Sequence, residues 1–192
     1  MTGNLDRRDV TAKLLNDRDD LLVVAGLGAP CWDVAAAGDH DLNFGLWGAM
    51  GGAAMIGLGL ALARPDRRVL VITGDGEQLM GLGSLSTIGS ASPTNLAIAV
   101  LDNECYGETG MQPTATGLGT DLAAVAAACG FVATAQADRP EEVEATVALC
   151  RAAVGPVFAV FKISDDVPPQ VVPPRQGPLL VSRFRSALGI QG

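Results

Sequence analysis

The sequence predicts an α/β fold: a single domain with one doubly wound parallel sheet and helices on both of its faces. Apolar runs of strand length alternate with helix-like stretches along most of the chain. A strand that is apolar at consecutive positions must be covered on both faces, which is typical of parallel sheets flanked by helices. With 192 residues, the chain is long enough for one sizeable core and too short for two ordinary catalytic domains.

Strands and helices alternate in the predicted order of elements. Five apolar runs predict strands at 21–25, 69–73, 96–101, 131–135 and 157–163. A further short strand is a candidate at 43–46. The segments between them predict helices over 5–15, 31–37, 49–63, 79–90, 120–129 and 140–153. A helix between two strands carries the chain back to the edge where the first strand began, so successive strands are expected to be parallel. Such connections are almost always right-handed.

The chain divides into residues 1–163, which form the predicted domain, and residues 164–192. Prolines at 168, 169, 173, 174 and 178 remove amide donors and forbid a helix there, so this stretch should be an extended arm. A short helix over 181–188 is expected to end the chain and to pack on this subunit or on a neighbour.

The composition limits the classes of partner. The net charge is −8 and no run of Lys or Arg occurs, so nucleic acid is not an expected partner. A small anionic ligand would then need a metal ion or backbone dipoles to hold it. Hydrophobic residues make up 48% of the chain, more than one domain needs to fold, so part of its surface should face another chain.

Membrane insertion and export are both unexpected. Residues 42–63 carry no charge, but Asn43 and six glycines within the segment lower its apolarity and helix propensity, which favours a buried strand and helix. The N-terminus carries acids and bases where a secretory signal needs an apolar core, so a cytoplasmic protein is expected. The wide spacing of the four cysteines indicates ordinary reduced thiols, at Cys31, Cys105, Cys129 and Cys150.

The chemistry is expected where two predicted strands end. Gly74, Asp75 and Gly76 follow the strand 69–73, and Asn103 follows Asp75 by 28 residues, close to the length of one βαβ unit. Ligands of open α/β sheets bind at this carboxyl edge, and glycines allow the backbone to approach a phosphate. A carboxylate and an amide oxygen suit Mg²⁺ or Ca²⁺ completed by phosphate oxygens.

These motifs resemble the metal-diphosphate motif of thiamine-diphosphate-dependent enzymes. The resemblance rests on Gly74-Asp75-Gly76 and on the segment 101–107, which reads LDNECYG, and it extends upstream to LWGAMG at 46–51 and AGLGA at 25–29. It covers residues from about 20 to 163. It implies that thiamine diphosphate is held through Mg²⁺, whose ligands would be the Asp75 and Asn103 side chains and the Cys105 carbonyl.

Further residues take roles from the same resemblance. The Gly48 carbonyl would accept a hydrogen bond from the 4'-amino group of the cofactor. Met50 would support the bent cofactor, although an unbranched apolar residue also fills a core. The other predicted cofactor-binding residues are Gly26, Gly28, Gly74, Gly76, Glu77 and Tyr106. Two residues depart from the usual pattern: Glu77 places a carboxylate near the phosphates, and Asp102 stands where many relatives have Asn.

Within the family, the segment 102–116 most resembles the sulfopyruvate and phosphonopyruvate decarboxylase branch. The resemblance implies decarboxylation of a small anionic 2-oxo acid. Residues 107–119 suit a mobile loop that closes over the substrate. One of two residues of this loop would touch the substrate: Glu108, which is a catalytic candidate, or Gln112. Alternatively, each of these side chains lies on the solvent-exposed face of the loop and has no role in catalysis.

Three other residues are weighed for chemistry. His40, the only histidine, lies between Asp39 and Asp41, which would keep it charged to higher pH, and it could transfer a proton or occupy a plain surface turn. Cys31 and Cys105 would act as nucleophiles only if a base or a helix end lowered the pKa of the thiol.

The assembly follows from what the chain lacks. Enzymes resembling this one need a second domain whose glutamate activates the cofactor, so we expect a separate pyrimidine-binding subunit, in a homodimer or hetero-oligomer that uses residues 42–63 as a contact surface. The alternatives are the β subunit of a 2-oxoacid:ferredoxin oxidoreductase, a non-catalytic cofactor-binding module, and a nucleotide-binding domain based on Gly26-x-Gly28.

Overall fold

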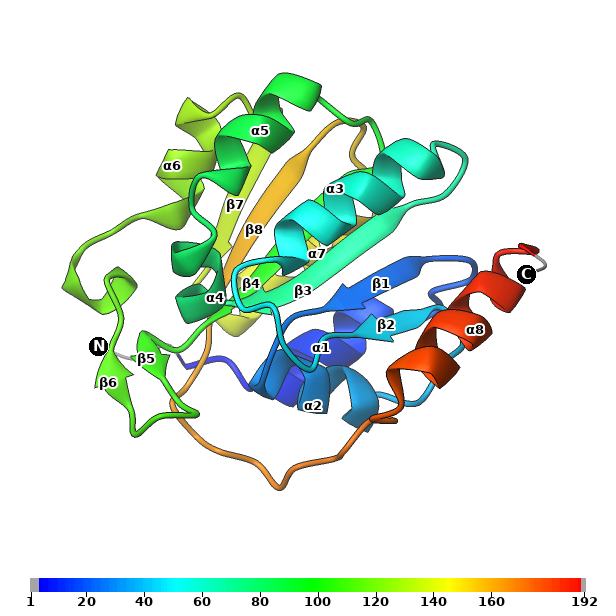
Figure 1. Ribbon diagram of the computed structural model, residues 1–192. Coiled ribbons are helices and arrows are strands. Elements are labelled where there is room, and N and C mark those ends of the chain that lie inside the picture. Colours follow the sequence, from blue (N-terminus) through cyan, green and yellow to red (C-terminus); the bar gives the residue numbers. More distant parts are fainter. Residues whose placement is uncertain (1–3, 191–192) are drawn as a thin grey trace.

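A computed structural model of the chain describes residues 4–190 and has a six-stranded sheet at its centre (Figure 1). The strands lie in the order β2-β1-β3-β4-β8-β7, and each neighbouring pair is parallel. Their bounds are β1 Leu22–Ala25, β2 Asn43–Gly45, β3 Val69–Gly74, β4 Leu96–Asp102, β7 Ala133–Ala137 and β8 Val157–Lys162.

Helices cover both faces of this sheet, as Figure 1 shows. One face carries α1 (Arg7–Leu15), α2 (Ala29–Ala36) and α7 (Pro140–Ala152). The other carries α3 (Ala53–Ala63), α5 (Ser84–Ala91) and α6 (Leu122–Ala128), and α8 (Gly177–Ala187) lies beside β2. The prediction of a doubly wound parallel sheet is therefore confirmed.

The core consists of two layers because successive strand residues point to opposite faces. Val23 packs in the layer beneath α1, α2 and α7, whereas its neighbour Val24 packs beneath α3, α5 and α6. The central strand β4 is buried at every position, which explains why its sequence is apolar throughout.

Most predicted helix ends lie within two residues of those in the structure, but the helices expected over 49–63, 79–90 and 181–188 differ by more. The helix expected over 79–90 is two helices, α4 (Asp75–Met80) and α5, because a Cβ atom at Gly81 would lie 2.3 Å from the Gly51 carbonyl oxygen. The helix expected from 49 begins only at Ala53, since Ala49 and Gly51 have positive φ angles of 58° and 86°. The loop 46–52 thus packs closely against the junction of α4 and α5.

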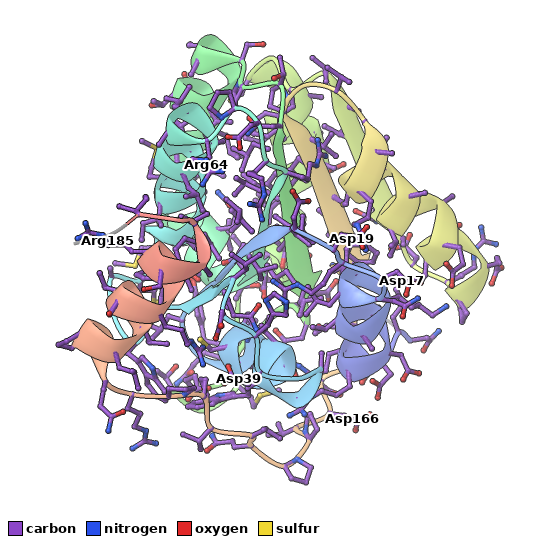
Figure 2. The ribbon with its side chains drawn as sticks, turned by 90° about the vertical axis from the view of Figure 1, so that its right-hand side faces the viewer. Asp17, Asp19, Asp39, Arg64, Asp166 and Arg185 are labelled. Atoms are coloured by element: carbon purple, nitrogen blue, oxygen red, sulfur yellow. The ribbon has the colours of Figure 1, made fainter. Side chains whose placement is uncertain are left out.

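The segment 42–63 forms β2, a loop and α3. In the part of the chain that the structure describes, no helix has both the length and the apolar character needed to cross a bilayer. Residues after 163 run as an extended arm to α8, which begins at Gly177 instead of 181. The expectation that Pro178 forbids a helix is wrong because Pro178 lies in the first turn of α8, where a missing amide donor costs no helix hydrogen bond. The helix packs on its own chain, with the Phe184 and Phe44 rings 5.6 Å apart. Arg183 of α8 also donates two hydrogen bonds to Asp39, one of the surface charges that Figure 2 labels.

Candidate functional site

The strand order brings three loops together at the carboxyl edge of the sheet. The chain moves from β1 outward to β2 and then returns to β3 on the other side of β1, so the loops after β1 and β3 diverge there. The loop after β4 lies next to that of β3. A cavity of about 380 Å³ opens at this edge, and its lining includes Leu27, Asp75 and Asn103.

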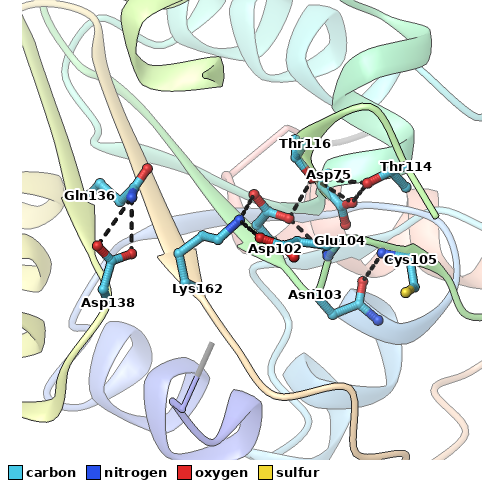
Figure 3. A network of polar contacts seen from close by, with 10 residues as sticks. All are labelled: Asp75, Asp102, Asn103, Glu104, Cys105, Thr114, Thr116, Gln136, Asp138 and Lys162. Atoms are coloured by element: carbon cyan, nitrogen blue, oxygen red, sulfur yellow. Dashed lines mark hydrogen bonds and ion pairs between the residues drawn. The ribbon is translucent and has the colours of Figure 1, made fainter. Parts of the chain in front are cut away.

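Asp75 is the first residue of α4 and its side chain is buried at 2% exposure. The Thr114 hydroxyl donates to Asp75 Oδ2 at 2.6 Å, and the Thr116 hydroxyl lies 3.3 Å from the same oxygen (Figure 3). Burial raises the pKa of Asp75 to about 6, with the Thr114 hydrogen bond opposing this shift and the Asp102 charge adding to it. A cation beside this carboxylate would relieve the cost of its burial.

Asp102, at the end of β4, has a cationic partner. Lys162, opposite it in the β4–β8 register, lies 3.0 Å from Asp102 Oδ2 and 2.5 Å from Glu104 Oε1. Burial lowers the pKa of Lys162, but the hydrogen bonds to Glu104 and Asp102 outweigh burial and keep the pKa above its usual value. Thr116 donates to Asp102 Oδ1 at 2.8 Å. Asp102 stands where many relatives of the resembling family have Asn, and its negative charge is compensated by Lys162 and the Thr116 hydroxyl.

Asn103 and Cys105 lie on the cavity side of the same segment. The Asn103 Oδ1 atom accepts a hydrogen bond from the Cys105 amide at 3.3 Å, which fixes the orientation of the side chain. The Tyr106 ring lies over Gly76, where a Cβ atom would be 2.6 Å from the ring. Carboxylate, amide and carbonyl oxygens are the donors that Mg²⁺ accepts, and phosphate oxygens complete such a shell, so the residues fit this ion.

Glu77 lines the cavity but its carboxylate turns inward to the loop after β1. Its Oε2 atom accepts hydrogen bonds from the Leu27 amide at 2.9 Å and the Thr73 hydroxyl at 2.8 Å. A Cβ atom at Gly26 would lie 2.0 Å from that oxygen. Burial raises the pKa of Glu77, opposed by the hydrogen bond from Thr73. Gly26 therefore makes room for Glu77, and Glu77 fixes the loop that forms one cavity wall.

Aromatic side chains connect the cavity wall to the C-terminal arm. Trp32 of α2 donates to Glu108 Oε1 at 3.2 Å, and the rings of Trp32 and Trp47 lie 5.3 Å apart in an edge arrangement. Trp47 donates to the Pro174 carbonyl at 3.0 Å, and the Arg175 guanidinium lies 4.9 Å from the Trp47 ring. The cavity, the loop 46–52 and the arm are therefore in contact.

Met50 lies at the edge of the cavity with 40% of its surface exposed. The alternative in which Met50 fills the core is therefore wrong for this chain. Gly48 is exposed on the same loop, and no atom outside its immediate neighbours lies within 4 Å of a Cβ built there. Both residues of this loop are available to a ligand or to another chain.

Two arginines, Arg7 and Arg8, also line the cavity. Arg7 Nε and Arg8 Nε each lie 2.7 Å from an oxygen of Asp33, which is 1% exposed in its side chain. Burial raises the pKa of Asp33, and the two arginines oppose that shift. Arg8 Nη2 also donates to the Pro169 carbonyl of the arm at 2.8 Å. Two cations share one carboxylate, so this group of three side chains carries one net positive charge.

The structure brings most of the predicted residues to one cavity. Its lining contains Met50, Gly74, Asp75, Gly76, Glu77, Asn103, Cys105, Tyr106 and Glu108. Gly26, Gly28 and Gly48 lie on the flanking loops and not in its lining, although a Cβ at Gly28 would lie 3.1 Å from the Glu108 side chain. Gln112 is also outside the lining and bonds within its own hairpin, formed by β5 (Cys105–Tyr106) and β6 (Gln112–Pro113).

His40 lies elsewhere, in the turn before β2, where its Nδ1 atom accepts from the Leu42 amide at 3.1 Å. Burial and the nearby Arg18 lower the pKa of His40 despite its acidic neighbours, so the expectation of prolonged charge is wrong. Burial raises the pKa of Cys31 to about 11, and burial with the Asp75 charge raises that of Cys105. Neither thiol is activated as a nucleophile.

Several site residues escaped the sequence reasoning. Thr114 and Thr116 lie at the end of the segment 102–116 as two alternating β-branched hydroxyl residues, a pattern that could have signalled their role. Lys162, a charge at the end of an otherwise apolar strand, carried a similar signal. Among residues 4–190, the side chains of His, Cys, Asp and Glu do not gather in threes around any point that could hold a metal. A metal site in this region would therefore need amide, carbonyl and ligand oxygens in addition to the Asp75 carboxylate.

Comparison with known proteins agrees with this arrangement. Residues 28–161 match the family model described as "Thiamine pyrophosphate enzyme, C-terminal TPP binding domain". The solved structure of a protein assigned as a thiamin diphosphate-dependent enzyme from Mycobacterium smegmatis superimposes with a TM-score of 0.69 at 22% identity, over 86% of this chain and 33% of that one. That likeness shows the fold.

Sequence relatives are more specific. The chain is 44% identical to the sulfopyruvate decarboxylase subunit beta of Methanocaldococcus jannaschii, over 65% of this chain and 66% of the relative. It is 42% identical to the same-named subunit of Methanothermobacter thermautotrophicus over 85% and 86%. The phosphonopyruvate decarboxylase of Streptomyces viridochromogenes is 41% identical, but the match spans only 36% of that protein. The chain therefore belongs to the thiamine pyrophosphate enzyme family, of which it carries the C-terminal cofactor-binding domain.

Proposed function

We propose that this chain binds thiamine diphosphate through Mg²⁺ and is the pyrophosphate-binding subunit of a two-subunit enzyme that decarboxylates a small anionic 2-oxo acid. One observation carries the proposal: Asp75 and Asn103, at the ends of the paired strands β3 and β4, line a single cavity. Their side-chain oxygens and the Cys105 carbonyl would hold the cation. An acidic chain can bind a diphosphate in this way because the cation separates like charges.

The residues of the chain have separate tasks in this proposal. Thiamine diphosphate, when bound, supplies the ring that stabilises the carbanion left by loss of CO₂. Glycines at 74 and 76 permit close approach of the phosphates, and Met50 supports the cofactor at the open edge. Glu108, fixed by Trp32, would face the substrate. Orientation and electrostatics are thus the contribution of the protein.

The net positive charge of the Arg7–Arg8–Asp33 group in the cavity lining supports an anionic substrate. Arg7 and Arg8 face Asp33 as two cations against one anion, and the same cavity is lined by Asp75 and Glu77. A second acid group on the 2-oxo acid, such as a sulfonate or phosphonate, would be attracted to the arginines. Guanidinium groups suit such oxyanions because their N–H donors form paired hydrogen bonds.

A separate subunit is proposed to complete the site. Relatives from two methanogens are named as beta subunits, which supports a partner chain. The partner chain would contact the exposed apolar residues at and beside the loop 46–52, which are Trp47, Met50, Met55 and Met80. The partner would supply the glutamate that activates the pyrimidine ring, and the smallest symmetric assembly would contain two copies of each chain.

Binding and turnover test the proposal in two steps. Calorimetry should detect thiamine diphosphate binding with Mg²⁺ and none with a chelator, and Asp75→Ala should abolish the metal-dependent binding. Unchanged cofactor affinity in that variant would remove the basis for the metal site.

The second step uses the cognate subunit. This chain alone should not decarboxylate any 2-oxo acid in a panel, and addition of the partner should restore turnover. Ferredoxin reduction with coenzyme A would instead favour the oxidoreductase alternative, and cofactor binding without turnover in the assembled complex would favour a non-catalytic module.

A further inference from the structure

The loop 107–119 returns two buried threonines to the candidate metal ligand. Thr114 and Thr116 are 1% and 8% exposed, and both hydroxyls lie within hydrogen-bond distance of Asp75 Oδ2. Figure 3 shows them converging on this carboxylate from the segment that follows the hairpin. Within residues 4–190, no side chain donates a hydrogen bond to the other oxygen, Oδ1. One face of the carboxylate is therefore held by the protein.

Proton counting assigns one hydroxyl to each carboxylate. A threonine carries a single O–H donor, so two threonines supply two protons to the four short contacts around them. The shortest contacts are Thr114 to Asp75 at 2.6 Å and Thr116 to Asp102 at 2.8 Å. The Thr114 and Thr116 oxygens are 2.9 Å apart, so the two side chains are in contact, although with both protons assigned to carboxylates neither hydroxyl donates to the other. Lys162 then holds the other oxygen of Asp102.

The backbone makes this contact depend on how the loop is docked. The Thr114 amide donates to the Glu104 carbonyl at 2.8 Å, which closes the hairpin next to Asn103. Asn103 precedes the hairpin and Thr114 follows it, so the two ends of this short segment contribute one proposed metal ligand and the hydroxyl that fixes the other proposed ligand, Asp75. The geometry of both ligands would change together if the loop moved.

We propose that Thr114 is a positioning residue that directs Asp75 Oδ1 to the cation, and that docking of the loop 107–119 and cation binding are thereby linked. The inference rests on the proposed function, since it assumes that Asp75 ligates the metal. Thr116 assists by packing against Thr114 and by donating to Asp102, whose other oxygen Lys162 holds. Linkage is reciprocal: an ordered loop favours the cation, and the cation with its diphosphate favours the ordered loop.

Removal of the hydroxyl tests the positioning role. Binding of Mn²⁺ in the presence of thiamine diphosphate is measured by water-proton relaxation for wild type, Thr114→Val and Thr114→Ser. Loss of a group that orients a metal ligand typically weakens metal binding about 10- to 100-fold, and this loss is expected for Thr114→Val. Thr114→Ser keeps the hydroxyl and should bind as wild type does.

A second measurement follows the loop itself. Hydrogen exchange of residues 107–119 should slow when Mn²⁺ and thiamine diphosphate bind to wild type and should respond much less in Thr114→Val. In the assembled enzyme, the cation concentration for half-maximal turnover should rise, whereas turnover at saturating cation should be largely recovered. A residue that served stability alone would not shift this concentration.

Thr146→Val is the matched control. The Thr146 hydroxyl is buried at 5% exposure and bonds the Glu142 carbonyl within α7, so its removal should leave cation binding unchanged. If Thr114→Val does not fold, Thr116→Val removes the neighbouring hydroxyl and should weaken binding to a smaller degree. Unchanged or tighter cation binding in folded Thr114→Val would overturn the inference. No cofactor-dependent cation binding in wild type would overturn the proposed function and this inference with it.

Discussion

Replacing Asp75 by asparagine should make the metal-free chain more stable while it destroys the cation site. Burial raises the pKa of Asp75 from 3.8 to about 6. Each pKa unit corresponds to about 1.4 kcal/mol, so the folded chain loses about 3 kcal/mol when this buried group ionises. An amide of the same shape avoids that loss, and its oxygen can still accept the Thr114 hydrogen bond.

The direction of the Asp75 pKa shift determines the pH range in which this residue affects stability. Because the folded chain binds the Asp75 proton more tightly than the unfolded chain does, the stabilisation is complete below pH 3.8 and is lost as the pH rises through about 6. The advantage of Asp75→Asn over wild type should therefore grow by about 1.4 kcal/mol between pH 5 and pH 8, as that linkage predicts. Above pH 7 the full advantage is expected.

Urea unfolding in the presence of a chelator measures this difference directly. Addition of Mg²⁺ and thiamine diphosphate should stabilise wild type and leave Asp75→Asn unchanged, which reverses their order. Asp166→Asn, at an exposed carboxylate labelled in Figure 2, is the control for removal of a surface charge. A variant that is less stable than wild type at pH 8 without metal would refute the reasoning about burial.

Three further predictions follow from the same cavity. Lys162→Met should cost about 3–5 kcal/mol in urea unfolding by leaving Asp102 buried without a cation, and Asp102→Asn in that background should recover most of the loss. Arg8→Gln should lower kcat/KM about 10- to 100-fold for 2-oxo acids with a second anionic group and leave pyruvate unaffected, which a substrate panel with the assembled enzyme decides. Met50→Ala should change the unfolding free energy of this chain by less than about 1 kcal/mol because the side chain is 40% exposed, whereas turnover of the complex should fall and Met50→Leu should retain it.

The sheet could be predicted from sequence because its strands are buried on both faces. The strand β4 is apolar from Leu96 to Leu101, and such a run has few alternatives to a central parallel strand. Helix bounds were predicted less well where glycine contacts decide them. The break at Gly81 depends on the approach of Gly51, 30 residues earlier in the chain, which no local propensity contains.

The same distinction applies to the site. Asp75 and Asn103 could be predicted to lie together because each directly follows a strand, and βαβ spacing places neighbouring strand ends at one edge. The inward orientation of the Glu77 side chain could not be predicted from sequence, since it depends on the space left by Gly26 in another loop. Lys162 and Thr116 meet Asp102 only through the β4–β8 register and the return of a loop, and both are tertiary relations.

The pair of tryptophans gives the chain its own optical reporter. The sequence contains only two tryptophans, and both lie at the candidate site: Trp32 bonds Glu108 in the cavity wall, and Trp47 contacts the arm and Trp32. Indole emission depends on the polarity and charge around the ring, and every indole in this chain is near the cavity. Its intrinsic fluorescence will therefore record cofactor entry, movement of the arm or arrival of a partner chain without any attached dye. Trp32→Phe and Trp47→Phe would then separate signals from the cavity wall and from the outer loop.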